Sequence, residues 1–421
     1  MKTKAMKDRA TTGLVPKLRF PEFRGAEEWT NKQLGELFSD RQEAGRSGLP
    51  LLSLMDKEGI VPQEDSNRKN NSNSDKSKYL RVVPGDIAYN TMRMWEGRSA
   101  LVGLEGLVSP AYTVCEPQPG VHSLLFSYYF KTPQLIEQFR RFSQGLVKDT
   151  LNLKYPAFAQ ISAPVPTYPE QEKIADCLDS LDELIAAQGR KVEALKTHKK
   201  GLMQQLFPRE GETQPRQRFP EFQETADWTS EPFGEVFDTT SGGTPSRSNN
   251  EYWNGDIPWV TTSQVNFGVI TEAEEFLTES GLKNSSAKVF PKGTVLIAMY
   301  GQGKTRGQVA MLGIDAATNQ ACAAVLPSKK VDPRFVFFNL SARYEELRRL
   351  SNSGGQENLS QGLIRELRFS YPEEVAEQRR ITDCLSSADA LITAATLALD
   401  SLKIHKQGLM QQLFPSPEKQ A

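Results

Sequence analysis

The strongest constraint on this chain is that much of its sequence occurs twice. The run Arg19–Phe23 (RFPEF) returns 199 residues later as Arg218–Phe222, and Gly201–Pro208 (GLMQQLFP) returns letter for letter 207 residues later as Gly408–Pro415. A chain built from two copies of one unit has pseudo-twofold symmetry, so we expect it to meet its partners and its target in two related places. Because the second spacing is longer, the added residues lie within the second globular block, and the helical segments keep their lengths.

Four segments alternate along the 421 residues, after a basic, polar arm at residues 1–16 that we expect to be mobile. Residues 17–168 and 211–372 are predicted to be mixed α/β domains, because short apolar runs lie between Gly- and Pro-rich turns. Residues 169–210 and 373–421 are predicted to be long helices, the second with a short tail. The fold class that follows is α+β, with an internal pseudo-twofold repeat.

Within the two mixed blocks, several elements can be placed from the pattern. Runs of β-branched and aromatic residues predict strands, and apolar residues at helical spacing predict helices. A polar Asn/Ser/Lys-rich segment at residues 65–78 is predicted to be a loop. The predicted strands are Ile87–Tyr89, Ala111–Val114 and Thr294–Met299, and the predicted helices are Ser123–Phe142 and Pro333–Leu350.

The long helices carry an apolar residue every three or four positions. We call this stripe the seam; it must be buried against another helix. The first helix is predicted to begin at Glu170 and to end at Pro208. Gln188, Lys199 and Lys406 interrupt the stripe. The seam residues are Ile174, Leu178, Leu181, Ile185, Val192, Leu195, Leu202 and Leu206 in the first helix and Ile381, Leu385, Ile392, Leu399, Leu402, Leu409 and Leu413 in the second.

The simplest partner of each long helix is the other one, forming a coiled coil; a helix from another subunit is the alternative. Length alone allows either direction, and twofold-related copies would run antiparallel. Gly201 and Gly408 interrupt the helices near their ends. Since glycine is unfavourable inside a helix, its presence in both copies predicts a bend or a close approach, with a tolerated surface glycine as the alternative.

The composition argues against several classes of protein. Cys115, Cys177, Cys322 and Cys384 form two pairs of repeat mates and lie in no metal-binding motif, so reduced thiols, no metal site and a cytoplasmic location are expected. No apolar run approaches the ~20 residues of a membrane helix. With three histidines in the chain, a histidine-based catalytic centre is not expected either.

A glycine-rich run at Gly301–Gly307 resembles a phosphate-binding loop but has Ala298 where that motif needs its first glycine. A turn that presents Lys304 and Arg306 to a polyanion fits better, and the chain is predicted to be non-catalytic. Arg, Lys, Asn and Gln side chains in turns can contact phosphates and base edges. Such candidates are Asn90, Arg93, Arg98, Lys148 and Asn152 in the first block and Gln264, Lys304, Arg306, Gln308, Asn319, Gln320 and Asn358 in the second.

The ordered duplicate of block, helix, block and helix resembles the specificity subunit of type I restriction-modification systems. The resemblance covers nearly the whole chain. It is carried by the RFPEF entry to each half with Trp29 and Trp228, by Gly85–Ile87, Gly293–Val295 and Val108–Tyr112, and by the runs from Asn152 to Ile174 and from Asn358 to Ile381.

The resemblance implies two target-recognition domains, each reading one half of a split DNA sequence, separated by an antiparallel coiled coil. It implies two methyltransferase (modification) subunits that bind S-adenosylmethionine, and restriction (motor-nuclease) subunits that bind ATP and Mg²⁺. This chain would hold no cofactor. Two alternatives remain open at this point: a coiled-coil scaffold whose duplicated modules bind protein, and a phosphate-loop hydrolase.

Overall fold

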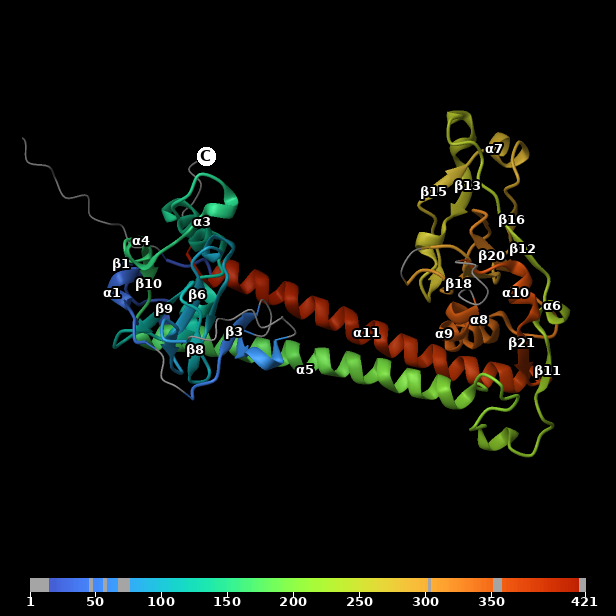
Figure 1. The fold of residues 1–421 in the computed structure, drawn as a ribbon, viewed down its shortest axis with the longest axis horizontal. Helices are drawn as coiled ribbons and strands as arrows, with labels where there is room; N and C mark the ends of the chain where they lie inside the picture. The colour runs from blue at the N-terminus through green and yellow to red at the C-terminus, as the bar shows by residue number, and fades with distance from the viewer. Residues whose placement is uncertain are drawn as a thin grey trace, which may run out of the picture. The chain divides into compact units, whose positions relative to one another are not determined.

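The computed structural model describes residues 15–44, 48–55, 59–66, 76–301, 304–350 and 358–415. Most of the predicted N-terminal arm (residues 1–14), most of the polar segment 65–78 and residues 302–303 of the glycine-rich run lie outside the described residues. The chain forms two compact units, unit 1 from residues 1–189 and 398–421, and unit 2 from residues 190–397. Each unit therefore contains one mixed block, part of one long helix and part of the other (Figure 1).

Unit 1 is built around an antiparallel sheet of order β2-β9-β6-β7. Three two-stranded antiparallel sheets flank it, formed by β1 with β10, β3 with β4 and β5 with β8. The strands are β1 (Thr30–Gln33), β2 (Phe38–Asp40), β3 (Leu52–Met55), β4 (Gly59–Pro62), β5 (Leu80–Val82), β6 (Ile87–Asn90), β7 (Ser99–Leu101), β8 (Gly106–Val108), β9 (Tyr112–Pro117) and β10 (Ser162–Val165). The helices are η1 (Pro21–Phe23), α1 (Leu34–Leu37), η2 (Gln63–Asp65), η3 (Met94–Glu96), α2 (Ser123–Tyr129), α3 (Pro133–Phe142), η4 (Lys148–Thr150) and α4 (Tyr155–Phe158).

Unit 2 repeats this plan with additions. Its main sheet has the order β12-β20-β17-β18-β14, in which only β14 is parallel to its neighbour among the described strands, and a second sheet has the order β15-β13-β19-β16. The strands are β11 (Thr229–Pro232), β12 (Thr239–Ser241), β13 (Trp253–Val260), β14 (Val269–Ile270), β15 (Glu275–Leu277), β16 (Val289–Phe290), β17 (Val295–Ala298), β18 (Val309–Leu312), β19 (Ala316–Thr318), β20 (Cys322–Val325) and β21 (Arg368–Tyr371). The helices are η5 (Pro220–Phe222), α6 (Phe233–Val236), η6 (Asn250–Tyr252), η7 (Thr262–Gln264), α7 (Glu279–Lys283), α8 (Pro333–Ala342), α9 (Tyr344–Leu350) and α10 (Gln361–Glu366).

The predicted strands are confirmed as β6, β9 and β17, but each predicted helix is two helices. In unit 1 the break precedes Pro133. Proline disfavours helical backbone in the residue before it, and Thr132 is extended, with φ −76° and ψ 146°. In unit 2 the helices are separated at Arg343, whose φ of −96° and ψ of 16° end α8. The apolar periodicity continued across both breaks, which is why one helix was predicted.

The two long helices are α5 (Tyr168–Leu206) and α11 (Val375–Leu413). α5 begins two residues before the predicted start, so Pro169 lies in the first turn, where its missing N–H leaves no hydrogen bond unmade. The close approach predicted at Gly201 and Gly408 is wrong, because no neighbouring atom lies within 4 Å of a Cβ added at either position. Both glycines are tolerated and are not required by packing.

The seam of each long helix is covered within each unit. In unit 1, Ile174 and Leu178 of α5 share a core cluster with Leu413 of α11. In unit 2, Leu206 shares a cluster with Ile381 and Leu385. All the predicted seam positions in both helices are buried or half-buried. Since ascending positions in α5 meet descending positions in α11, the helices run antiparallel within each unit.

The core of unit 1 is aromatic. Trp29 is 1% exposed and meets Tyr129 and Phe414 edge-on at 6.5 Å between ring centroids, while Tyr129 stacks on Phe414 at 4.6 Å. The matching core of unit 2 places Phe335 against Trp228 and Phe207. The final residues of each long helix thus complete the core of the block beside them.

One of the described helices, α11, is long and apolar enough by composition to cross a membrane. Amphipathic helices of packed coiled coils can pass the same test, so length and hydropathy do not by themselves indicate a membrane span.

Candidate nucleic-acid interface

The RFPEF repeat and the start of each long helix form the same polar cluster twice. Arg19 donates from Nε and Nη2 to the two carboxylate oxygens of Glu170, at 2.8 and 2.7 Å. Arg218 donates in the same way to Glu377, at 2.8 and 2.6 Å. Both glutamate side chains are 1% exposed, and the hydrogen bonds to them raise the pKa of both arginines. We call each pair the anchor; its bidentate geometry fixes orientation as well as distance.

The next residue of each helix adds a second fixed point. Gln171 accepts the His122 N–H at 2.9 Å and donates to the Pro166 carbonyl at 3.0 Å. Gln378 makes the equivalent bonds, to the Asp332 N–H at 2.8 Å and the Pro372 carbonyl at 2.8 Å. Both glutamines are almost fully buried. The Glu-Gln pair therefore holds the helix start rigidly against its block in both units.

The lysines that interrupt the seam have symmetric partners. Lys406 donates to Asp182 at 2.6 Å in unit 1, and Lys199 donates to Asp389 at 2.5 Å in unit 2. Each lysine is 18% exposed and lies over a ring, at 4.6 Å from the centroid of Tyr128 for Lys406. Burial, followed by a hydrogen bond to Asp182, raises the pKa of that tyrosine. Each seam lysine therefore has a carboxylate partner when the two helices pack in this register.

In unit 1, three DNA-contact candidates lie at the end of β6 and in the turn that follows it. Arg93 and Arg98 both form ion pairs with Glu96, at 3.2 Å each, and their side chains are about two-fifths exposed. Asn90 accepts the Met92 N–H at 3.0 Å. Exposed ion pairs contribute little stability, so both guanidinium groups can exchange this carboxylate for phosphate or a base edge at small cost.

The other two candidates of unit 1 come from a segment beside that turn. The Leu153 N–H donates to the Thr91 carbonyl at 2.8 Å, which places the neighbouring Asn152 close to the end of β6. Asn152 is half-buried, and its side-chain oxygen accepts no hydrogen bond within the described part of the chain. Lys148, in η4, is exposed. The structure therefore places Asn152 near the turn that contains Arg93 and Arg98.

Unit 2 gathers its candidates around the corresponding strand end. The Met299 N–H, just after β17, donates to the Ala321 carbonyl at 2.8 Å, and the Met299 carbonyl accepts the Leu359 N–H at 3.1 Å. These bonds bring the turn at Asn319 and Gln320 and the exposed Asn358 to one edge of the sheet. Thr91 in unit 1 makes the matching bonds, to Ala111 and Leu153.

The remaining candidates of unit 2 flank this edge. Lys304 is exposed, and Arg306 and Gln308 are half-buried in the turn between β17 and β18. Gln308 donates to the Asn266 side chain at 3.3 Å, and Gln264 donates to the Glu272 carbonyl at 3.2 Å. Sequence reasoning missed the turn that contains Asn266. Its Asn-Phe-Gly sequence is a turn signal that could have identified it.

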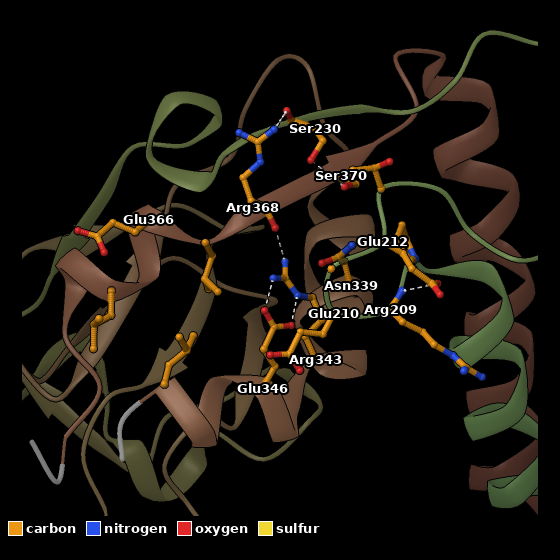
Figure 2. A pocket seen from close by; sticks show the side chains of 16 residues that line it. Arg209, Glu210, Glu212, Ser230, Asn339, Arg343, Glu346, Glu366, Arg368 and Ser370 are labelled. Atoms are coloured by element: carbon orange, nitrogen blue, oxygen red, sulfur yellow. Dashed lines mark hydrogen bonds and ion pairs between the residues drawn. The ribbon is translucent and has the colours of Figure 1, made fainter. Parts of the chain in front are cut away.

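The pocket shown in Figure 2 lies in unit 2 between residues 208–213 and helices α8 to α10, with a volume of about 470 Å³. Arg343 donates to both carboxylate oxygens of Glu346, at 2.7 and 2.6 Å, and to the Arg368 carbonyl at 2.8 Å. Arg368 in turn donates to the Ser230 carbonyl. No histidine or cysteine lines the pocket, and the described residues contain no group of metal ligands. Among the charged side chains that line it, Arg343 and Glu346 are thus paired with each other.

Part of the chain matches a known protein family, and several curated proteins are similar to it. Residues 225–400 match the family model described as the type I restriction modification DNA specificity domain. The MjaVIII specificity subunit of Methanocaldococcus jannaschii is 25% identical over 80% of this chain and 82% of that protein. The MjaIX subunit of the same organism is 30% identical over 41% of each chain, and the EcoR124I/EcoR124II subunit of Escherichia coli is 25% identical over 57% of this chain and 58% of its own.

Solved structures agree in fold. A type I restriction-modification S subunit from M. genitalium matches with a TM-score of 0.57 and 16% identity, over 96% of this chain and 100% of that one. A chain from a study of complex assembly in the type I system matches with a TM-score of 0.58 and 17% identity, over 92% and 98%. Residues 225–400 thus match the type I restriction modification DNA specificity domain, and nearly the whole chain shares the fold of a solved type I specificity subunit.

Proposed function

We propose that this chain is the DNA-recognition subunit of a type I restriction-modification complex, in which each unit reads one half of a bipartite target. The observation that carries the proposal is the matched pair of polar edges, at the ends of β6 and β17, each in a unit that anchors a long helix. The recognition domains would be residues 17–168 and 211–372. The chain would be non-catalytic and cytoplasmic.

The residue types at each edge suit two kinds of contact. Lys148 and Lys304 are exposed cations that can neutralise phosphates and so make binding depend on salt. Arg98, Asn319 and Gln320 can make paired hydrogen bonds to base edges in the major groove. Because the two units differ at nearly all of these positions, they would read different half-sites.

The long helices would set the spacing between half-sites. α5 has 39 residues and is therefore about 58 Å long at 1.5 Å per residue. The anchors and the Lys–Asp pairs fix the helices in each unit, as a rigid spacer requires. A rigid spacer converts protein length into a number of base pairs.

The same helices would also dock two methyltransferase subunits. Leu184 in α5 is 50% exposed, and its repeat mate Leu391 in α11 is 58% exposed. Matched apolar side chains on both copies support two equivalent docking sites. Those subunits would bring S-adenosylmethionine, and restriction subunits would bring ATP and Mg²⁺.

The decisive experiment maps methylated adenines in cells that carry the chain with its partner subunits. Two recurring half-sites at a fixed spacing are expected. Replacing residues 211–372 with another recognition domain should then change one half-site and leave the other unchanged. A change in both half-sites would contradict modular reading. DNA-independent assembly without methylation would favour the scaffold alternative.

A further inference from the structure

One aromatic side chain of unit 2 is exposed on a backbone conformation that phenylalanine rarely adopts. Phe267 has φ +50°, and its side chain is 37% exposed. The only other described non-glycine residue with positive φ is Asn254, a residue type that tolerates this region. In the left-handed region Cβ crowds the following carbonyl oxygen, so a phenylalanine here is unfavourable unless its surroundings enforce it.

The surroundings of Phe267 hold the ring in place. The Phe267 N–H donates to the Val309 carbonyl at 2.8 Å, and the Met311 N–H donates to the Gly268 carbonyl at 3.0 Å. The ring meets Tyr344 edge-on, with 5.1 Å between centroids. The Tyr344 hydroxyl donates to the Lys304 carbonyl at 2.5 Å. The ring is therefore a fixed projection attached to the edge strand of the main sheet.

The groove beside the ring is lined by side chains of both charges, with basic ones in excess. Phe267 and Tyr344 line a groove of about 880 Å³ together with Lys196 and Lys200 of α5. Both lysines are exposed. Asn266, which precedes Phe267 in the chain, accepts a hydrogen bond from the DNA-contact candidate Gln308. Aromatic rings beside exposed cations are the combination that contacts bases and phosphates together.

We propose that Phe267 is an apolar wedge that enters the base stack of the half-site read by unit 2, an assignment that rests on the proposed function. Apolar side chains of DNA-bending proteins partly unstack a base step in this way. The ring is already held in position, so its ordering costs little on binding. Asn266 and Gln308 flank it and would contact the edges of the same step.

The test uses the full chain assembled with its methyltransferase subunits and a duplex that carries the mapped target. 2-Aminopurine is placed in turn at each adenine of the half-site read by unit 2 except the methylated one, which a methyltransferase flips out of the stack. Wild type should raise fluorescence at one step, because unstacking relieves quenching. Phe267→Gly keeps the positive φ but removes the ring, so the fluorescence signal should vanish and the affinity should fall about 10-fold. Phe267→Trp should retain the signal.

Phe276→Ala is the matched control, since Phe276 is 38% exposed in β15 but does not line the groove. It should leave both affinity and fluorescence unchanged. Phe267→Asn provides a second ring-free variant that tolerates the backbone, so the wedge stays testable if the glycine variant is unstable. Unchanged fluorescence and affinity in a folded ring-free variant would overturn the wedge and leave the proposed function intact. Failure of the wild-type complex to bind the duplex would overturn both.

Discussion

Unit 1 and unit 2 share a frame and differ in what the frame carries. The central order β2-β9-β6-β7 in unit 1 is the order β12-β20-β17-β18 in unit 2, with every pair antiparallel in both. The anchors, the buried glutamines and the Lys–Asp pairs are also duplicated. The features that the two units share are therefore those that hold the long helices in place.

The units diverge at the connection between two antiparallel strands. In unit 1, β4 begins at Gly59, shortly after β3 ends at Met55, whereas residues 261–274 separate β13 from β15 in unit 2. The longer connection contains β14, which extends the main sheet, and the turn that presents Phe267. Within the core, Tyr129 of unit 1 stacks on Phe414, while the described pocket of unit 2 is lined by Asn339 on α8. Divergence is thus concentrated away from the anchors.

The largest effect is expected from a substitution that removes one anchor and leaves the other intact. Glu377→Ala should destabilise unit 2 by about 3–5 kcal/mol, because the largely buried Arg218 loses its carboxylate partner. Hydrogen exchange of the intact chain should show lost protection in residues 190–397 and little change elsewhere. Glu221→Ala is the control, since its ion pair with Arg380 is about half exposed and should cost less than ~1 kcal/mol. Equal loss of protection in both units would contradict independent anchoring.

A smaller effect is expected from the seam lysines. Asp389→Lys should destabilise by about 1–2 kcal/mol, because it places a like charge beside the largely buried Lys199. Adding Lys199→Asp should restore most of the loss, as measured by thermal unfolding of the double variant. Asp182→Lys with Lys406→Asp is the matched pair in unit 1. Double variants no more stable than the single ones would show that the pairs do not act through their charges.

The smallest effect tests the helices themselves. Gly201→Ala and Gly408→Ala should each stabilise the chain by about 0.5–1 kcal/mol, because alanine is a better helix former and an added Cβ meets no atom within 4 Å. Urea unfolding measures the gain. Gly242→Ala provides the opposite case, since an added Cβ would lie 1.9 Å from the Thr318 carbonyl oxygen. Destabilisation by both helix substitutions would contradict the open space around these two positions.

The duplication, the two long helices and their apolar stripe could be predicted from sequence because each depends on local spacing. The strands at Ile87 and Val295 were predictable for the same reason. The breaks before Pro133 and at Arg343 were missed because apolar periodicity continues across them, although Pro133 was a usable signal.

The sequence by itself determined that two similar units exist and that each is joined to a long helix. Only the tertiary structure decided that Arg19 and Glu170, 151 residues apart, form one anchor, and that Asn319 and Asn358 meet at the end of β17. The physical reason is that such contacts depend on strand pairing and burial between segments distant in sequence. The sequence shows which residues are repeated, and the tertiary structure shows which of them come into contact.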